Sequence, residues 1–207
     1  MIATLMLLVA SLTHAGDTLP CYDSAEFKPL WLEVDSAELE KLHQIRDFSF
    51  TNQEGQVVPE KDVAGKLYVA SFFFSTCPGI CPALRSKLPI VQEVFLEHDS
   101  IAILSHSIRP TTDTVEVLQQ YTKNNDVRKG KWHLLTGDKS ALYDLARKPY
   151  FAREDLGDPS KNNDFLHTEN LLLIDQHRHI RGIYNGLSKS SVKNLIADIK
   201  TLIANMN

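Results

Sequence analysis

The feature that most constrains this chain is an apolar segment that runs directly into two closely spaced cysteines. Residues Leu67 to Phe74 read Leu-Tyr-Val-Ala-Ser-Phe-Phe-Phe, and Ser75-Thr76-Cys77-Pro78-Gly79-Ile80-Cys81-Pro82 follows. A near-continuous apolar run of this length is typical of a central strand covered on both faces. We therefore expect a buried strand, then two thiols, then a helical pattern from Pro82 to Leu96. Pro89 should kink this helix or cap a short first part.

The rest of the chain alternates between strand and helix patterns. Strands are expected at Ile101 to Ile108, Trp132 to Leu135, Asn170 to Asp175 and Ile180 to Tyr184. Helices are expected from Asp113 (as N-cap), at Asp138 to Lys148 and at Ser188 to Ala204. Phe48 to Thr51 and Val57-Val58, separated by Asn52-Gln53-Glu54-Gly55, form a hairpin signal. These patterns predict an α/β protein with a thioredoxin-like fold. Its central mixed sheet has helices on both faces and an N-terminal hairpin extension.

The beginning of the chain has the character of a targeting segment. An apolar run from Ile2 to Leu12 precedes Thr13-His14-Ala15, where small residues have the spacing that signal peptidases prefer. We expect a signal peptide at 1–15, an N-terminal extension at 16–45 and a thioredoxin-like domain at 46–207. The other interpretation of the apolar run is a short buried helix. Export would place the protein in the bacterial periplasm or at the outer face of the inner membrane, where thiols are oxidised.

Composition narrows the classes of partner. The 207 residues suffice for one domain with a real core, and the formal charge is −4. Because no Lys/Arg block stands out, a nucleic-acid partner is disfavoured. We expect a monomer. Of the three cysteines, Cys21 is left over and fits an ordinary residue in an extended segment.

The cysteine pair has the chemistry of a soft-metal or redox site. Cys77 lies about one helical turn before Cys81, so the two sulfurs can reach each other or share one ion. The positive end of a helix dipole would favour thiolates, which bind metals and attack disulfides. Cu(I) accepts two thiolates, often with a third ligand, whereas zinc requires four ligands.

A third ligand would come from among eight histidines. His106 and His133 fall in strands, where either could be a core or edge residue, and His98 ends a helix. His177 and His179 fall in a tight hairpin turn, where exposed polar residues are expected. His167 differs because it follows a polar loop and comes just before the strand Asn170 to Asp175, and in a thioredoxin-like topology that position adjoins the cysteine loop.

Four segments resemble the Sco/SenC family of copper proteins, which take part in cytochrome c oxidase assembly. They are Phe72 to Pro82, Leu104-Ser105-His106-Ser107-Ile108, Trp132-His133-Leu134-Leu135-Thr136-Gly137 and Leu166-His167-Thr168-Glu169. The resemblance implies a thioredoxin-like fold and a copper ion held by Cys77, Cys81 and His167. It implies copper delivery to the apo copper-site subunit of the oxidase, with other copper chaperones as further partners, or reduction of that subunit's disulfide. Two places depart from the family. Its members usually have an acidic residue between the cysteines or just before the second, where this chain has Gly79-Ile80, and many carry Asp-Pro where this chain has Arg109-Pro110.

Two other functions fit the same thiols. A thiol-disulfide oxidoreductase would cycle a Cys77–Cys81 disulfide, although such enzymes of this fold more often have two residues between the cysteines. A thiol peroxidase would use one thiolate against peroxide and the other to resolve it, with Arg85 as a nearby cation unless it is merely exposed. A purely structural disulfide is disfavoured, because a staple stabilises most when it closes a long loop.

Overall fold

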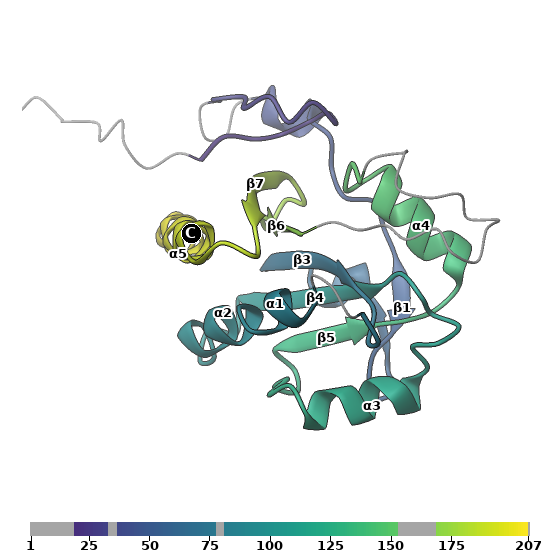
Figure 1. Ribbon diagram of the computed structural model, residues 1–207. Helices are drawn as coiled ribbons and strands as arrows, with labels where there is room; N and C mark the ends of the chain where they lie inside the picture. Colours follow the sequence, from purple (N-terminus) through teal and green to yellow (C-terminus); the bar gives the residue numbers. More distant parts are fainter. Residues whose placement is uncertain (1–18, 33–36, 78–80, 153–168, 207) are drawn as a thin grey trace, which may run out of the picture.

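The computed structural model of the chain describes residues 19–32, 37–77, 81–152 and 169–206 (Figure 1). The strands are β1 (Ser49–Thr51), β2 (Val57–Pro59), β3 (Leu67–Phe73), β4 (Ile101–Ser107), β5 (Trp132–Leu135), β6 (Asn170–Ile174) and β7 (Ile180–Asn185). The α-helices are α1 (Cys81–Arg85), α2 (Leu88–Val94), α3 (Val115–Lys123), α4 (Lys139–Arg147) and α5 (Lys189–Ala204). Two short 3-10 turns, Leu39–Lys41 and Glu60–Asp62, complete these elements.

A five-stranded mixed sheet in the order β5-β4-β3-β6-β7 forms the centre of the molecule. The strand β3 pairs in parallel with β4 and antiparallel with β6, and every residue of β3 and β4 is buried. This confirms the central strand expected from the apolar run. The antiparallel pair β6–β7, joined by the hairpin turn expected at His177 and His179, makes one edge of the sheet antiparallel.

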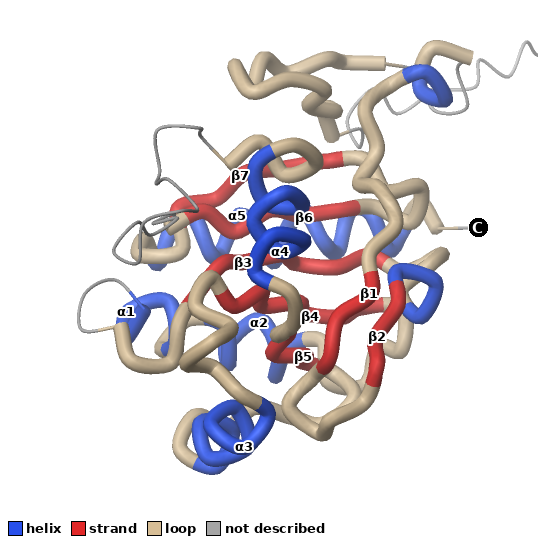
Figure 2. Tube along the Cα trace, turned by 90° about the vertical axis from the view of Figure 1, so that its right-hand side faces the viewer, coloured by secondary structure: helices blue, strands red, loops and turns tan. Residues whose placement is uncertain are grey.

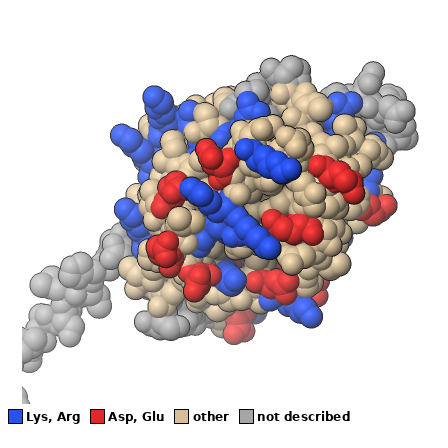
Figure 3. Space-filling view, turned by 90° about the horizontal axis from the view of Figure 1, so that it is seen from below, with Lys and Arg blue, Asp and Glu red and all other residues tan. Residues whose placement is uncertain are grey.

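Helices cover both faces of this sheet, which confirms the predicted thioredoxin-like α/β architecture. Figures 1 and 2 show α2 and α5 on one face, and α4 with the β1–β2 hairpin on the other. A backbone bridge between Thr51 and Thr136 ties the hairpin to the segment after β5. On the face of the molecule shown in Figure 3, acidic and basic side chains are interspersed.

The helical pattern from Pro82 to Leu96 divides into two short helices. Ser86 N–H donates to Ala83 O at 3.1 Å and Lys87 N–H donates to Leu84 O at 2.9 Å, so the chain makes a tight turn between α1 and α2. Pro89 lies in the first turn of α2, where its missing N–H costs no helical hydrogen bond. The proline therefore starts the second helix, and the first is only five residues long.

Part of the expected N-terminal extension docks on the edge strand β7. Tyr22 N–H donates to Ile180 O at 3.0 Å, and the Arg181 guanidinium donates to the carbonyl oxygens of Pro20 (3.1 Å) and Leu19 (2.5 Å). The bond to Ile180 O satisfies a backbone carbonyl that an open sheet edge would leave to solvent. The expected signal segment lies outside the described residues, so the domain boundaries stay a prediction. Among the described helices, none is long and apolar enough to span a membrane.

Candidate metal centre

Cys77 lies in a tight turn directly after the central strand. The strand β3 ends at Phe73, and Cys77 N–H donates to Phe74 O at 3.2 Å. Its side chain is 8% exposed and carries a free thiol. Because the turn is short and its strand is fully buried, Cys77 sits on a rigid support at the carboxyl end of β3.

The other two predicted ligands lie beyond what the structure describes. Cys81 is the first residue of α1, so the chain does pass from a strand through the first cysteine to a helix that begins at the second. Its side chain and His167 lie outside the described residues, so the ligand set Cys77, Cys81 and His167 stays a prediction. Within the described ranges, no three His, Cys, Asp or Glu side chains are grouped to hold a metal ion.

The sheet register shows at which end of the sheet β6 begins. In the antiparallel β3–β6 pair, Ala70 lies opposite Leu172 and Tyr68 lies opposite Ile174. The start of β6 and the end of β3 therefore lie at the same end of the sheet. Cys77 comes four residues after β3 ends, and His167 precedes the first residue of β6 by three.

The first helix begins at Cys81 and is short, with only five residues. The expected effect of its dipole on the thiols stays a prediction. Arg85 at its last position is exposed, in line with the structural interpretation of that residue.

A buried carboxylate, that of Asp113, is hydrogen-bonded to the cysteine turn. Asp113 was expected to cap the following helix, but the N-cap of α3 is Thr114, whose side chain accepts from Val117 N. Asp113 is fully buried and accepts instead from Ser75 and Ser107. The capping prediction was wrong because Asp113 bonds to strand ends that are distant in sequence.

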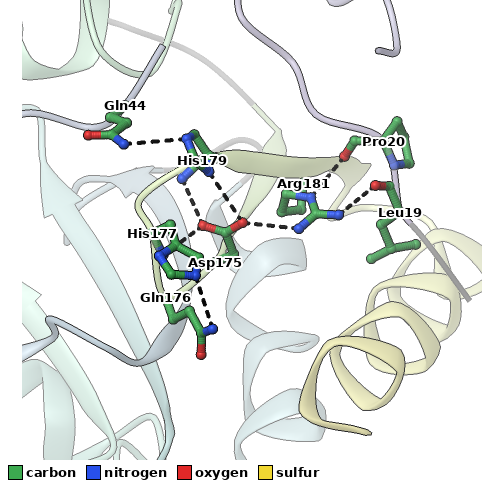
Figure 4. Close-up of polar contacts among 8 residues, drawn as sticks. All are labelled: Leu19, Pro20, Gln44, Asp175, Gln176, His177, His179 and Arg181. Carbon is green, nitrogen blue, oxygen red and sulfur yellow. Dashed lines mark hydrogen bonds and ion pairs between the residues drawn. The ribbon is translucent and has the colours of Figure 1, made fainter. Parts of the chain in front are cut away.

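The histidines of the β6–β7 turn behave differently from each other (Figure 4). His177 is exposed as expected, but His179 is buried with a side chain 5% exposed. His179 Nδ1 lies 3.6 Å from Asp175 Oδ2, and Gln44 Nε2 lies 3.4 Å from His179 Nε2. The expectation of exposure was wrong for His179, because Asp175 and the segment before β1 enclose its ring.

Asp175 is the centre of this second cluster. The N–H groups of His177 and His179 donate to Asp175 Oδ1 at 2.9 Å each, and Arg181 donates to Oδ2 at 3.0 Å. Burial opposes ionisation of Asp175, but the hydrogen bonds and charges of His179 and Arg181 outweigh it and lower the pKa. The cluster joins the β6–β7 turn to the N-terminal segment, at the end of β6 opposite its start.

Cys21 and the histidines of β4, β5 and the N-terminal segment are buried or half-buried. Cys21 is buried, and burial raises the pKa of its thiol, although the charge of Arg181 partly opposes the rise. His133 lies 3.4 Å from Asn52 Nδ2, and burial lowers its pKa. His43 Nε2 lies 2.8 Å from Pro149 O. His106 is fully buried in the middle of β4.

Comparisons with known proteins identify the family. A family model described as SCO1/SenC matches residues 36–204, so the chain belongs to the SCO1/SenC family. A curated relative, the SCO1 protein homolog of Bacillus subtilis (strain 168), is 25% identical over 161 residues, which are 77% of this chain and 82% of the relative. The cysteine-to-proline motif and the strand pattern thus predicted the family correctly.

Solved structures share the fold. A SCO1/SenC family lipoprotein from Bacillus anthracis str. Ames superposes with a TM-score of 0.70 at 28% identity, covering 78% of this chain and 95% of that one. BsSco, described with a disulfide switch and as a member of the Sco family of cytochrome c oxidase assembly proteins, gives a TM-score of 0.68 at 24% identity and 78% and 94% coverage. ScoI of Bradyrhizobium japonicum, solved with copper bound, gives 0.61 at 23% identity and 76% and 98% coverage.

Proposed function

We propose that this protein binds a copper ion as cargo through Cys77, Cys81 and His167 and delivers it to the apo copper site of cytochrome c oxidase. The observation that carries the proposal is the free Cys77 thiol at the carboxyl end of β3, the end of the sheet at which β6 also begins. Family membership and the copper-bound ScoI of B. japonicum support the identity of the metal.

The donor types suit Cu(I) better than other common ions. Two thiolates are soft ligands, and one neutral imidazole would complete a three-coordinate set. A tetrahedral zinc site would need a fourth protein ligand, or an open position for catalysis. Both thiols lose their protons on binding, so the affinity for copper falls as the pH falls.

Release of the ion requires a partner with competing ligands. Thr76 is exposed directly beside the buried Cys77, so a partner that docks at this turn would bring its thiolates close to those of Cys77 and Cys81 and could replace them one at a time. The oxidase subunit with its empty copper site is the partner that we infer, since BsSco is described as an oxidase assembly protein. We also infer that the protein is exported to the periplasm or the outer face of the inner membrane and acts there as a monomer.

The second candidate is a thiol-disulfide oxidoreductase, and the disulfide switch described for BsSco favours it over a peroxidase. In this reaction Cys77 attacks a disulfide of the partner and forms a mixed disulfide. Cys81 then attacks Cys77 and releases the partner with both of its cysteines reduced. The partner gains two electrons and two protons, and this chain ends with a Cys77–Cys81 disulfide.

Copper counting in matched variants tests the proposed ligand set. The purified protein is loaded anaerobically with Cu(I), and bound copper per chain is measured for the parent, Cys77→Ser, Cys81→Ser and His167→Ala. His177→Ala is the control, because His177 is an exposed turn residue. We expect one copper per parent and control chain, loss in both serine variants, and weaker binding in His167→Ala, which still forms the Cys77–Cys81 disulfide. Parent-like binding by His167→Ala would refute the ligand set.

A further inference from the structure

The Asp113 carboxylate connects the cysteine turn to the neighbouring strand. Ser75 N–H and Ser75 Oγ–H donate to Asp113 Oδ1 at 3.1 Å and 2.5 Å. Ser107 Oγ–H donates to Asp113 Oδ2 at 2.5 Å. Ser75 follows the end of β3 and Ser107 is the last residue of β4, so one side chain joins the ends of two adjacent strands.

The backbone around Asp113 is fixed as well. Asp113 N–H donates to Arg109 O at 2.8 Å, and Arg109 N–H donates to Ser107 Oγ at 3.0 Å. The Arg109 guanidinium carbon lies 5.3 Å from the centroid of the Phe74 ring, which belongs to the cysteine turn. The loop after β4 therefore holds the turn after β3 at two neighbouring points, Phe74 and Ser75.

Burying the Asp113 carboxylate completely has an unfavourable desolvation energy. Taking an acidic group out of water is unfavourable unless hydrogen bonds replace its hydration. Here one backbone N–H and two hydroxyls do so, and hydrogen bonds to a carboxylate are stronger than neutral ones. The helix that follows has its own cap in Thr114, so Asp113 is not needed to begin α3.

The position of Ser75 gives this network a consequence for the thiol. Ser75 is two residues before Cys77, inside the turn that the bond from Cys77 N–H to Phe74 O closes. Both the N–H and the hydroxyl of Ser75 are held by the same carboxylate oxygen. Asp113 therefore holds the backbone just before Cys77 against the end of β4.

We propose that Asp113 is a positioning residue that holds the Ser75–Cys77 turn, so that the Cys77 thiol is placed in advance to act together with the thiol of Cys81. This deepens, and rests on, the proposed function. A pre-placed thiol avoids the ordering cost that a mobile one would meet on binding a metal or closing a disulfide. Loosening the turn should weaken Cu(I) binding and make the Cys77–Cys81 disulfide easier to reduce.

The test compares Asp113→Asn and Ser75→Ala with Asp175→Asn. Asn has the size of Asp but replaces one acceptor oxygen with an NH2 group, and Ser75→Ala removes a single donor from the turn. Asp175 is the control because it is also buried and hydrogen-bonded, but it follows the end of β6 that is far from the cysteine turn. Cu(I) affinity is measured by competition with a chromophoric chelator, and the Cys77–Cys81 disulfide equilibrium is measured against glutathione.

We expect Asp113→Asn to lower Cu(I) affinity about tenfold and to shift the disulfide equilibrium about tenfold toward dithiol, about 30 mV for this two-electron couple. Ser75→Ala should shift both in the same direction by a smaller factor, and Asp175→Asn should lower only the resistance to urea. If Asp113→Asn or Ser75→Ala keeps the parent disulfide equilibrium, or Asp175→Asn shifts it equally, the proposal is refuted. Should Asp113→Asn fail to fold, Ser75→Ala decides alone. A parent that binds no copper would refute the proposed function, while the disulfide equilibrium would still decide the role of Asp113.

Discussion

His106 should make the folded state sensitive to mild acid. Its ring is fully buried, with the rings of Phe48, Phe50, Phe72 and Tyr150 at centroid distances of 5.4–6.0 Å. Neither ring nitrogen has a hydrogen-bond partner among the described residues. Burial lowers the pKa of His106 from 6.5 to about 4, and the nearby Ser71 backbone opposes this only in part.

The sign and size of the effect follow from proton linkage. Below pH 6.5 the unfolded chain protonates His106, whereas the folded chain resists protonation until about pH 4. The unfolded state then binds more protons, so the free energy of unfolding falls by about 1.4 kcal/mol per pH unit in this window. Between about pH 7 and about pH 4.5 the loss from this one group is about 2 kcal/mol.

The assay is urea unfolding, followed by far-ultraviolet circular dichroism, of the parent and of His106→Leu. Leucine suits the apolar cage and cannot titrate, while the carboxylates and His133 titrate in both proteins. The parent should therefore lose about 2 kcal/mol more than His106→Leu between about pH 7 and about pH 4.5. Stability curves that run parallel over this range would refute the reasoning.

Two further substitutions test the packing and charge of the sheet edge. Asp175→Asn should cost about 3 kcal/mol in urea unfolding near neutral pH, because it leaves Arg181 and His179 without their buried carboxylate. Since the pKa of Asp175 is lowered, its contribution is lost as acid protonates it, so the variant should lose less stability in acid than the parent; equal losses would contradict this. Gly182→Ala should cost about 1–3 kcal/mol, because a Cβ there would lie 2.2 Å from the hydroxyl oxygen of Tyr184, which donates to Asp198. In thermal unfolding this is a drop of about 2–4 °C per kcal/mol, and an unchanged melting temperature would mean that the Tyr184 ring moves freely.

The order of the elements was predictable because the patterns that define it are local. An apolar run covered on both faces has few alternatives to a central strand, and β3 is that strand. Ser188 begins the last helix as expected, because a side-chain cap depends on the next three residues only. Family-specific motifs then predicted the membership of the chain.

The contacts that the sequence did not predict join residues far apart in the chain. Asp113 was assigned to the nearest helix, whereas one of its partners, Ser75, is 38 residues away. His179 was assigned to an exposed turn, but it is covered by Gln44, which is 135 residues distant. Patterns in the neighbouring sequence predict the contacts that a residue makes with its neighbours in the chain. The hydrogen-bond partners of a buried polar side chain depend on which distant segments the fold brings together. The sequence shows that residue 113 is an aspartate, but its hydrogen-bond partners Ser75 and Ser107 could be identified only from the pairing of β3 with β4.

The most direct test of the ligand set is an X-ray absorption spectrum of the Cu(I)-loaded protein at the copper edge, compared with that of His167→Ala. Our account predicts two sulfur neighbours and one imidazole nitrogen in the parent, with the nitrogen missing and both sulfurs kept in the variant. A parent spectrum without an imidazole, or the same spectrum for both proteins, would contradict the assignment of His167 and with it the proposed copper site.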